Sequence, residues 1–179
     1  MRPSALLPLL LLSLAAPMAA TRAEPASAAI QRFQGAEIPS QTATDREGKS
    51  VDLAEFRGGI VVVNLWASWC APCKAEMPSL ERLAVLYPKD LTVLAISADS
   101  KGWSAVDRFW GPQYSHLRLA LASGPELAES LGAIALPYSL IVDREGREIA
   151  RVLQGAEWDK GAIRALIDRS VGAEVKNPS

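Results

Sequence analysis

The chain has 179 residues, of which 19 are basic, 20 are acidic and 49% are hydrophobic. This length suits one domain with some additional sequence, and the apolar content is sufficient for a hydrophobic core. Because positive and negative charges nearly balance, the composition argues against a nucleic-acid-binding surface.

The first 23 residues have the pattern of a secretory signal. Arg2 carries a positive charge ahead of the apolar run ALLPLLLLSLAA, and Thr21-Arg22-Ala23 offers a cleavage site. The run is shorter than the ~20 apolar residues that a membrane-spanning helix needs. Residues 1–23 are therefore predicted to be a signal peptide, with an uncleaved N-terminal membrane anchor as the alternative. Either form places the rest of the chain outside the cytoplasm.

Residues 24–37 show no clear periodicity and are predicted to be a linker. The domain is predicted to cover residues 38–172, and residues 173–179 are predicted to be a C-terminal tail. Near the start of this domain, the turn signal Glu47-Gly48 lies between two short segments and precedes the sequence DLAEF. This pattern predicts a β-hairpin followed by a helical turn.

A buried strand followed at once by a helix is predicted in the middle of the chain. Residues 60–66, IVVVNLW, form a nearly continuous apolar run that is typical of a central strand. From Pro72 to Tyr87 the apolar residues recur with helical spacing, and Pro78 is expected to kink this helix. The side chains expected to point inward are those of Met77, Leu80, Leu83, Ala84 and Leu86.

The remaining segments alternate between strands and helices. Strands are predicted at 91–97, 117–122, 138–143 and 148–154, and helices at 103–110, 124–132 and 158–170. This alternation predicts an α/β fold in which helices cover both faces of a mixed central sheet. Because reactive groups of such sheets gather at the carboxyl ends of strands, chemistry is expected directly after residue 66.

The two cysteines, Cys70 and Cys73, are too close in sequence to act as a structural cross-link. A disulfide between them would close a minimal loop and remove little entropy from the unfolded chain. A structural zinc site needs four ligands, and the chain has no further cysteine and one histidine, His116. A copper site would also need His116 or a methionine, and none of these adjoins the motif. Metal binding is therefore the weaker interpretation.

The spacing of the cysteines instead suits thiol-disulfide exchange. Cys70 would begin the helix, where unpaired backbone N–H groups and the helix dipole stabilise a thiolate. Cys73 would follow one turn later, more buried and within bridging reach, and Pro72 suits the first turn of the helix. We therefore expect Cys70 to exchange with a partner's sulfur and Cys73 to resolve the mixed disulfide.

Two neighbours extend this candidate site. Trp69 is expected to form a flat contact surface beside Cys70, although a position at the edge of the core is also open. Glu76 follows Cys73 by one helical turn, where a carboxylate can transfer protons for that thiol. A solvated helix carboxylate is the alternative interpretation of Glu76 at this point.

The segment VVVNLWASWCAPCKAEMPSLERL closely resembles the TlpA/ResA-like exported proteins of the thioredoxin fold. The preceding TDREGKSVDLAEFRGGIVVVNLW resembles their N-terminal hairpin extension, and LPYSLIVDREGREIARVLQG resembles their cis-proline loop and final strand pair. Together these segments cover roughly residues 38–170. The resemblance implies a thioredoxin fold and a thiol-disulfide oxidoreductase, usually a reductant in the periplasm.

The resemblance also assigns roles by position. It implies that Cys70 is the nucleophile, Cys73 the resolving thiol and Glu76 the acidic group below the active site. Pro137 takes the cis-proline position facing Cys70, and Leu136 would offer its backbone to an extended substrate segment. The residues expected to contact the substrate are Trp69, Ala71, Pro72, Leu136 and Pro137.

Several positions differ from related proteins. Asn64 stands where cytoplasmic thioredoxins carry a buried aspartate, which favours the exported branch and moves proton transfer towards Glu76. Ala71 replaces the glycine of thioredoxin, or the glutamate that is frequent in haem-maturation proteins. Tyr138-Ser139 follows the cis-proline where threonines are common. Because Ala71 and Tyr138-Ser139 border the substrate groove, these differences concern the choice of partner.

The residues Ala71-Pro72 resemble the Gly-Pro of a reductant, whereas strong oxidants tend to have a histidine there. We therefore expect a reductase of disulfides in selected client proteins, such as apocytochromes in cytochrome c maturation or factors that assemble copper sites of oxidases. Such a reductant needs a membrane electron-donor protein. The alternatives are a disulfide oxidase or isomerase and a copper-binding chaperone module. We expect a monomer without cofactor, metal ion or nucleic-acid partner.

Overall fold

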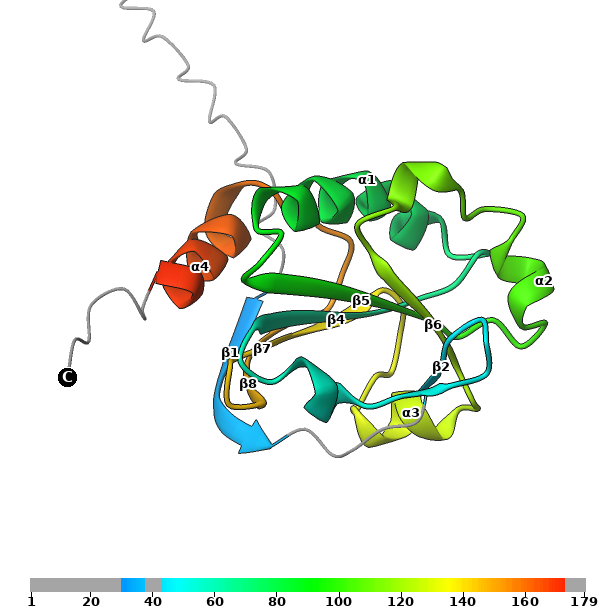
Figure 1. Ribbon diagram of the computed structural model, residues 1–179, viewed down its shortest axis with the longest axis horizontal. Helices are drawn as coiled ribbons and strands as arrows, with labels where there is room; N and C mark the ends of the chain where they lie inside the picture. The colour runs from blue at the N-terminus through cyan, green and yellow to red at the C-terminus, as the bar shows by residue number, and fades with distance from the viewer. Residues whose placement is uncertain (1–29, 38–42, 173–179) are drawn as a thin grey trace, which may run out of the picture.

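Helices lie on both faces of a mixed sheet in the computed structural model, which describes residues 30–37 and 43–172 (Figure 1). The strands are β1 (Ile30–Glu37), β2 (Ala43–Thr44), β3 (Ser50–Val51), β4 (Ile60–Trp66), β5 (Leu91–Ser97), β6 (Arg118–Ala122), β7 (Tyr138–Val142) and β8 (Arg147–Val152). Their order across the sheet is β1-β8-β7-β4-β5-β6-β2-β3. The helices are α1 (Ala71–Leu86), α2 (Trp103–Val106), α3 (Glu126–Ser130), α4 (Gly161–Gly172) and the short 3₁₀ helices η1 (Leu53–Phe56) and η2 (Pro112–Tyr114). This arrangement confirms the predicted α/β class.

Strand β4 forms the centre of the sheet, as its apolar run predicts. It pairs in parallel with β5 and antiparallel with β7, and all of its residues are buried. Side chains alternate between the two faces along a strand. Val62 and Trp66 therefore pack on the face of α1, whereas Val63 and Leu65 pack on the opposite face. Asn64 shares the α1 face, because it is two residues from both Val62 and Trp66.

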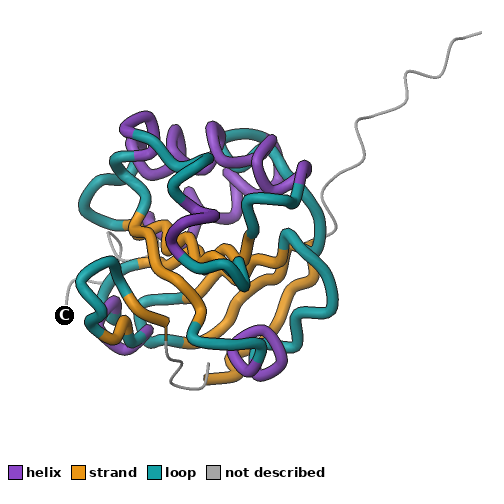
Figure 2. The backbone as a smooth tube through the Cα atoms, turned by 90° about the vertical axis from the view of Figure 1, so that its right-hand side faces the viewer, coloured by secondary structure: helices purple, strands orange, loops and turns teal. Residues whose placement is uncertain are grey.

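Two hydrophobic clusters, one on each face, hold the helices to the sheet. The side chains that α1 and α4 contribute to the first cluster include Met77, Leu80, Leu83, Ile163 and Ile167. Helix α3 contributes Leu127 to the second cluster, and Leu131 follows directly after that helix. Figure 2 shows the strands as a layer between helical segments. The sheet is thereby covered on both faces, as the sequence predicts.

Helix α1 agrees with its predicted pattern except at its last residue. Met77, Leu80, Leu83 and Ala84 are buried, as expected. Leu86 is half exposed, so the prediction that it points inward is wrong. At 100° per residue, Leu86 lies about 120° around the helix from Leu80, which is outside the buried stripe.

Residues 30–37 correct the prediction that this segment belongs to a linker. They form strand β1, which pairs antiparallel with β8 at one edge of the sheet. Ile30 lies opposite Val152 and Glu37 lies opposite Arg147, with an irregularity in the register between these pairs. The strand forms by pairing with a segment far along the chain, so the sequence of residues 30–37 does not itself indicate a strand.

Other predicted elements are confirmed with changed bounds. The hairpin β2–β3 turns at Gly48, whose φ of 80° favours glycine, and η1 follows it. Helix α2 ends at Val106, earlier than predicted, and helix α4 begins only at Gly161. The segment before α4 is a loop whose Trp158 is fully buried.

The pairing of β4 with β7 determines which loops meet near the cysteines. Leu65 lies opposite Tyr138, and the two strands run antiparallel. The loop that leaves β4 towards Cys70 therefore begins at the same end of the sheet as the segment that enters β7 through Pro137.

The predicted signal peptide at 1–23 and the predicted tail at 173–179 lie outside the described residues. Their assignment, and that of the domain bounds, stays a prediction. Within residues 30–37 and 43–172, no helix is long and apolar enough to cross a membrane.

Candidate active site

Cys70 and Cys73 form a disulfide at the start of α1, with Cα atoms 5.3 Å apart. Cys73 is fully buried, whereas Cys70 retains 5% of its exposure. Cys70 is the N-cap residue of α1, and its Sγ accepts a hydrogen bond of 3.3 Å from the backbone N–H of Cys73. Cys70 is therefore the outer sulfur. Its position at a helix N-terminus favours a thiolate once the disulfide opens.

Exposed side chains surround this outer sulfur. Trp69 is 69% exposed, and both Ala71 and Pro72 are exposed. An exposed tryptophan next to a reactive sulfur offers a large apolar surface for contact with another protein. The structure thus places three of the predicted substrate-binding residues around Cys70, and their role in binding stays a prediction.

Asp99 holds the backbone just before the cysteines. Its carboxylate accepts hydrogen bonds of 2.8 Å from the backbone N–H of Ser68, from the hydroxyl of Ser68 and from the hydroxyl of Ser97. These three donors compensate for the burial of its charge. Sequence reasoning missed Asp99, although a carboxylate just after the buried strand β5 was a usable signal.

The segment that enters β7 brings two further predicted residues to this end of the sheet. The peptide bond between Leu136 and Pro137 is cis, as the resemblance implies. Leu136 lines the same surface cavity as Trp69, the residue directly before Cys70. Pro137 itself is buried at the start of the strand.

Glu76 is buried on the sheet-facing side of α1 and does not lie in solvent. Only 2% of its surface is exposed. Its Oε1 accepts a hydrogen bond of 2.8 Å from Asn64 Nδ2. Its Oε2 accepts hydrogen bonds from the indole N–H of Trp158, at 3.0 Å, and from the backbone N–H of Ala156, at 3.1 Å. Glu76 lies three residues after the buried Cys73, so both occupy one face of the helix.

Burial raises the pKa of Glu76 from 4.5 to about 7. The hydrogen bonds from Trp158, Asn64 and Ala156 lower the pKa, because they favour the charged carboxylate, but they do not offset the loss of hydration. A carboxyl group with this pKa is present in both protonation states near neutral pH. It can therefore accept and return a proton during exchange.

Asn64 connects Glu76 to the neighbouring strand. Its Nδ2 donates to Glu76 and also to the hydroxyl of Ser139 on β7, both at 2.8 Å. Its Oδ1 is buried and has no hydrogen-bond partner among the described residues. The sequence identified Asn64 and Ser139 as unusual positions, and the structure shows that they belong to one buried polar network with Glu76.

The loop between β8 and α4 completes the surroundings of Glu76. It supplies Trp158 and Ala156, and a Cβ atom added to Gly155 would lie 3.4 Å from Pro72, so the loop also approaches the cysteines closely. Ser79 Oγ accepts a hydrogen bond of 3.1 Å from the backbone N–H of Trp158. Sequence reasoning missed this loop, because only tertiary contacts bring it to α1.

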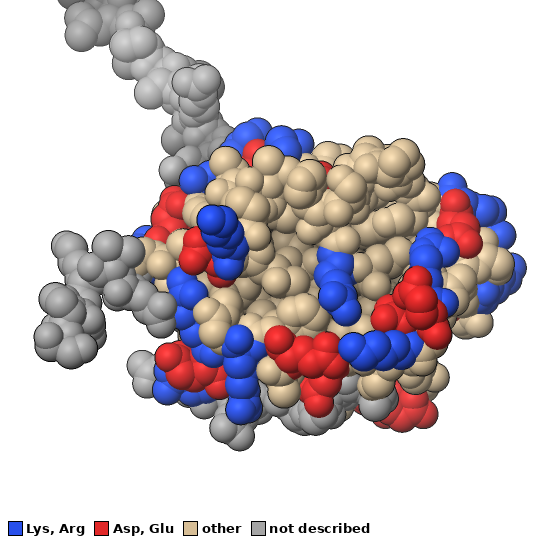
Figure 3. Space-filling view, in the orientation of Figure 1, with Lys and Arg blue, Asp and Glu red and all other residues tan. Residues whose placement is uncertain are grey.

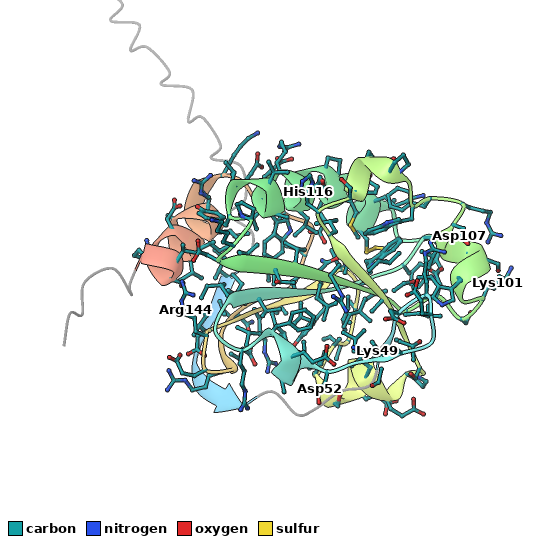
Figure 4. All side chains as sticks on the ribbon, in the orientation of Figure 1. Lys49, Asp52, Lys101, Asp107, His116 and Arg144 are labelled. Carbon is teal, nitrogen blue, oxygen red and sulfur yellow. A yellow bond between two sulfur atoms is a disulfide. The ribbon has the colours of Figure 1, made fainter. Side chains whose placement is uncertain are left out.

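His116 lies against α1, and it is labelled in Figure 4. Its ring Nδ1 pairs with Glu81 Oε1, and its backbone N–H also points to that carboxylate. The side chain of His116 is exposed. Within the described part of the chain, no three His, Cys, Asp or Glu side chains are grouped as metal ligands.

The surface in the view of Figure 3 has no large area of one charge. Basic and acidic side chains alternate along the lower margin and the sides, and an uncharged area extends over α1. This mixed pattern gives no sign of an extended basic surface on that face.

Comparisons with known proteins agree with this geometry. The family model for Redoxin matches residues 33–166. The chain is 34% identical over 119 residues to the thiol-disulfide oxidoreductase ResA of Bacillus thuringiensis subsp. konkukian, a match that covers 66% of this chain and 68% of ResA.

Solved structures are also similar. A thiol:disulfide interchange protein from Bacteroides sp. is 25% identical with a TM-score of 0.65, and the match covers 80% of this chain and 93% of that protein. The thioredoxin domain of a thiol-disulfide oxidoreductase from Bacteroides vulgatus is 24% identical with a TM-score of 0.62, covering 78% and 99%. These similarities confirm the thioredoxin fold that the sequence implies.

Proposed function

Because the chain belongs to the Redoxin family and is a ResA-like thiol-disulfide oxidoreductase, we propose that it reduces disulfides of selected client proteins outside the cytoplasm. The observation that carries this proposal is the Cys70–Cys73 pair at the start of α1, with the buried carboxyl group of Glu76 one turn behind it. The disulfide form described here is the state that remains after a client has been reduced.

Reduction begins with both cysteines as thiols. The Cys70 thiolate attacks one sulfur of the client disulfide, and a bond forms between Cys70 and the client as the client's disulfide breaks. The client's other sulfur leaves as a thiolate and takes up a proton. The helix N-terminus supports this step, because it stabilises negative charge on Cys70. The exposed Trp69 beside Cys70 is proposed to contact the client.

Resolution of the mixed disulfide is assigned to Cys73 and Glu76. Cys73 must lose its proton before it attacks Cys70, and its burial keeps water away. The carboxylate of Glu76, with a pKa of about 7, accepts this proton at neutral pH. The attack forms the Cys70–Cys73 disulfide and releases the second client thiol. In total, two thiols of the protein become a disulfide and the client's disulfide becomes two thiols.

Reduction, and not oxidation, is supported by Ala71-Pro72 between the cysteines. Thioredoxin has a potential of about −270 mV and the oxidant DsbA about −120 mV, a difference of about 7 kcal/mol for two electrons. We place this protein near the thioredoxin value. Since a reductant in an oxidising compartment cannot restore its own thiols, the proposal includes a membrane protein that donates electrons to Cys70–Cys73.

The proposed clients are apocytochromes during cytochrome c maturation, or factors that assemble copper sites of oxidases. The TlpA/ResA resemblance supports this choice, together with the signal-like residues 1–23, which support export to the periplasm. We propose that the domain acts as a monomer, either released or held at the membrane by its N-terminus.

A mixed-disulfide trap tests the proposal directly. In the Cys73→Ala variant, Cys70 is expected to hold clients as stable mixed disulfides, which non-reducing electrophoresis and mass spectrometry identify. The Cys70→Ala variant is the matched control and is expected to hold none. Recovery of no client by Cys73→Ala, while the wild type still reduces small disulfides, contradicts a selective reductase. A measured potential near −120 mV would instead support the oxidase alternative.

A further inference from the structure

Asp99 is a buried carboxylate, close to the loop that leads to the cysteines, that the proposed exchange reaction does not use. It lies two residues after β5 ends at Ser97, and only 7% of its surface is exposed. Its Oδ2 accepts hydrogen bonds of 2.8 Å from the backbone N–H of Ser68 and the hydroxyl of Ser97, and its Oδ1 accepts one of 2.8 Å from the hydroxyl of Ser68. A neutral side chain could hold Ser68 without the free-energy cost of a buried charge, so the charge itself calls for an explanation.

The hydrogen bonds of Asp99 fix the loop that presents Cys70. The backbone N–H of Cys70 donates to the carbonyl of Ala67 at 3.0 Å, which closes residues 67–70 as a turn. Ser68 lies inside this turn, and both its backbone N–H and its hydroxyl bind Asp99. One hydrogen bond and two residues of chain therefore separate the carboxylate from the backbone of Cys70, so the two lie within about 10 Å of each other.

The negative charge of Asp99 remains in place at this distance. Its three donors are neutral N–H and O–H groups, which satisfy the carboxylate oxygens without cancelling their charge. Because the interior of a protein has a much lower effective dielectric constant than water, a charge acts over such a distance more strongly there than in solvent. The carboxylate is thus placed to act on the sulfur of Cys70 through its electric field as well as through the loop.

Charged groups on the other elements around the cysteines make different contacts. On α1, Lys74 places its ammonium group over an aromatic ring, and Glu76 is held by three hydrogen bonds beneath the cysteines. In the loop before α4, Glu157 pairs with a basic side chain in solvent. The segment 133–137, which leads into β7, has no charged residue. Asp99 differs from these groups, because it binds the loop of the outer cysteine directly.

We propose that Asp99 is a positioning residue for Cys70 and that its charge lowers the reduction potential of the Cys70–Cys73 pair. A negative charge near a thiol opposes formation of the thiolate and so raises the pKa of that thiol. The thiolate belongs to the dithiol form alone, so the charge destabilises this form relative to the disulfide. The helix N-terminus acts in the opposite direction, and Asp99 limits its effect. The inference rests on the proposed function, because a lower potential makes the protein a stronger reductant.

Asp99→Asn removes the charge and preserves the pattern of hydrogen bonds. The asparagine carbonyl can accept from the Ser68 N–H and the Ser97 hydroxyl, and its amide can donate to the Ser68 hydroxyl, which is also an acceptor. The alkylation rate of Cys70 is measured against pH in the reduced full chain. The midpoint of this profile is expected to lie about one pH unit below that of the wild type, which is the effect of a unit charge about 10 Å away at an effective dielectric constant of about 20.

The equilibrium with glutathione provides a second readout. At pH values above the pKa of Cys70, a midpoint lowered by one unit moves the equilibrium of Asp99→Asn about tenfold towards the dithiol form, which corresponds to about 30 mV. A role in folding alone does not produce these two matching changes.

Ser68→Ala separates the position of the loop from the charge. It removes one hydrogen bond but keeps the carboxylate and its bond to the Ser68 N–H, so it is expected to retain the wild-type midpoint and potential while the loop exchanges amide hydrogens faster. Asp143→Asn is the matched control. Asp143 also accepts backbone N–H groups, from Glu145 and Arg147, but it follows β7 at the other end of the sheet. It is expected to leave the midpoint unchanged.

An unchanged midpoint and potential in Asp99→Asn overturn the inference. An equal shift in Ser68→Ala also overturns it, because the position of the loop would then account for the effect. Asp99→Ser is a second neutral variant and is expected to shift both readouts in the same direction. If neither neutral variant folds, the charge serves folding itself, which likewise overturns the inference. A wild-type potential close to that of a strong oxidant would instead contradict the proposed function, whatever the effect of Asp99→Asn.

Discussion

The protonation of Glu76 results from two opposing influences. Burial favours the neutral acid, whereas hydrogen bonds from Asn64, Ala156 and Trp158 favour the carboxylate. Burial prevails, but the donors keep the pKa near 7 and prevent a much higher value. Burial and hydrogen bonding together therefore make Glu76 a proton acceptor suited to neutral pH. Substitutions that change either its burial or its hydrogen bonds should change its pKa.

Glu76→Gln is expected to change how stability depends on pH. Between pH 4.5 and about 7, the folded protein holds a proton on Glu76 that the unfolded chain has lost. The free energy of unfolding of the wild type therefore falls as pH rises through this window, by up to about 3 kcal/mol. The glutamine variant lacks this decline, so its stability relative to wild type should increase from pH 5 to pH 8.

Urea denaturation at several pH values measures this effect. Asn64 can turn its free Oδ1 towards a glutamine amide, which keeps the buried network bonded. The exposed Glu47→Gln is the control and should follow the wild-type curve. The same Glu76→Gln variant is expected to slow disulfide exchange at neutral pH. Parallel stability curves for Glu76→Gln and wild type would contradict the raised pKa.

Trp158→Phe is expected to raise the pKa of Glu76 further, because it removes a hydrogen bond to the carboxylate. A hydrogen bond to a charged group contributes about 1.5–3 kcal/mol, which corresponds to a rise of about one to two pKa units. The inflection in the pH profile of the exchange rate should move upward accordingly.

Trp66→Phe is a matched control for this substitution. Trp66 is also fully buried, but its indole N–H has no hydrogen-bond partner among the described residues. Loss of packing is therefore similar in the two variants, whereas only Trp158→Phe changes the surroundings of Glu76. An equal shift in both variants would show that Trp158 acts through packing alone.

Part of the site was predictable because its signals are local. Cys70, Cys73 and Glu76 lie within two turns at the start of α1, so the spacing of the cysteines suggests their roles, and the family resemblance adds the role of Glu76. The hydrogen bonds of Trp158 to Glu76 and of Asn64 to Ser139 have no such local signal. Trp158 is 82 positions from Glu76 and Ser139 is 75 positions from Asn64 in the sequence, so the fold alone brings each pair together.

Hydrogen bonds and ion pairs hold the loop of residues 153–160 along one side of α1. Ser79 accepts the backbone N–H of Trp158, and Arg82 pairs with Asp159 and Glu157. Glu76, Ser79 and Arg82 are three residues apart, so they form one stripe on the helix. The loop that adjusts the pKa of Glu76 is therefore positioned by the same helix that carries Glu76.

Ser79→Ala is expected to loosen this loop more than Arg82→Ala does. Loss of the Ser79 hydroxyl leaves the buried N–H of Trp158 without its acceptor, at a cost of about 1–3 kcal/mol. The guanidinium of Arg82 is half exposed, so salt screens its ion pairs and their removal should have a smaller effect. Hydrogen exchange at the Trp158 amide and the free energy of unfolding measure both; a larger effect of Arg82→Ala would contradict this order.

Elements with a strong apolar pattern were predicted with accurate bounds, whereas others were not. Strand β4 matches the predicted residues 60–66, because a strand that is buried on both faces is a nearly continuous run of apolar residues. The sequence pattern of strand β1 predicts a linker, because β1 is an edge strand that forms through pairing with β8. Helix α4 begins later than its apolar pattern suggests, since Trp158 is buried by the loop and not by the helix.

Strand β1 also protects the sheet as a whole. It covers the edge of β8, and an uncovered edge strand is a template for pairing with other chains. A chain that begins at residue 38 is expected to be less stable than one that begins at residue 24, by an amount on the order of 2–5 kcal/mol for the lost backbone hydrogen bonds. Denaturation and analytical ultracentrifugation compare the two chains. Equal stability without self-association would show that β1 is dispensable.

The disulfide between residues three positions apart has a thermodynamic consequence. Folding and reduction form a closed thermodynamic cycle. The unfolding free energies of the oxidised and reduced proteins therefore differ by an amount proportional to the difference in reduction potential between the folded and the unfolded cysteine pair. Each 30 mV corresponds to about 1.4 kcal/mol. So short a loop barely restrains the unfolded chain. Two urea titrations, one with reductant and one without, therefore measure how far the reduction potential of the folded pair differs from that of the unfolded pair. A reductase should resist urea better in its oxidised form.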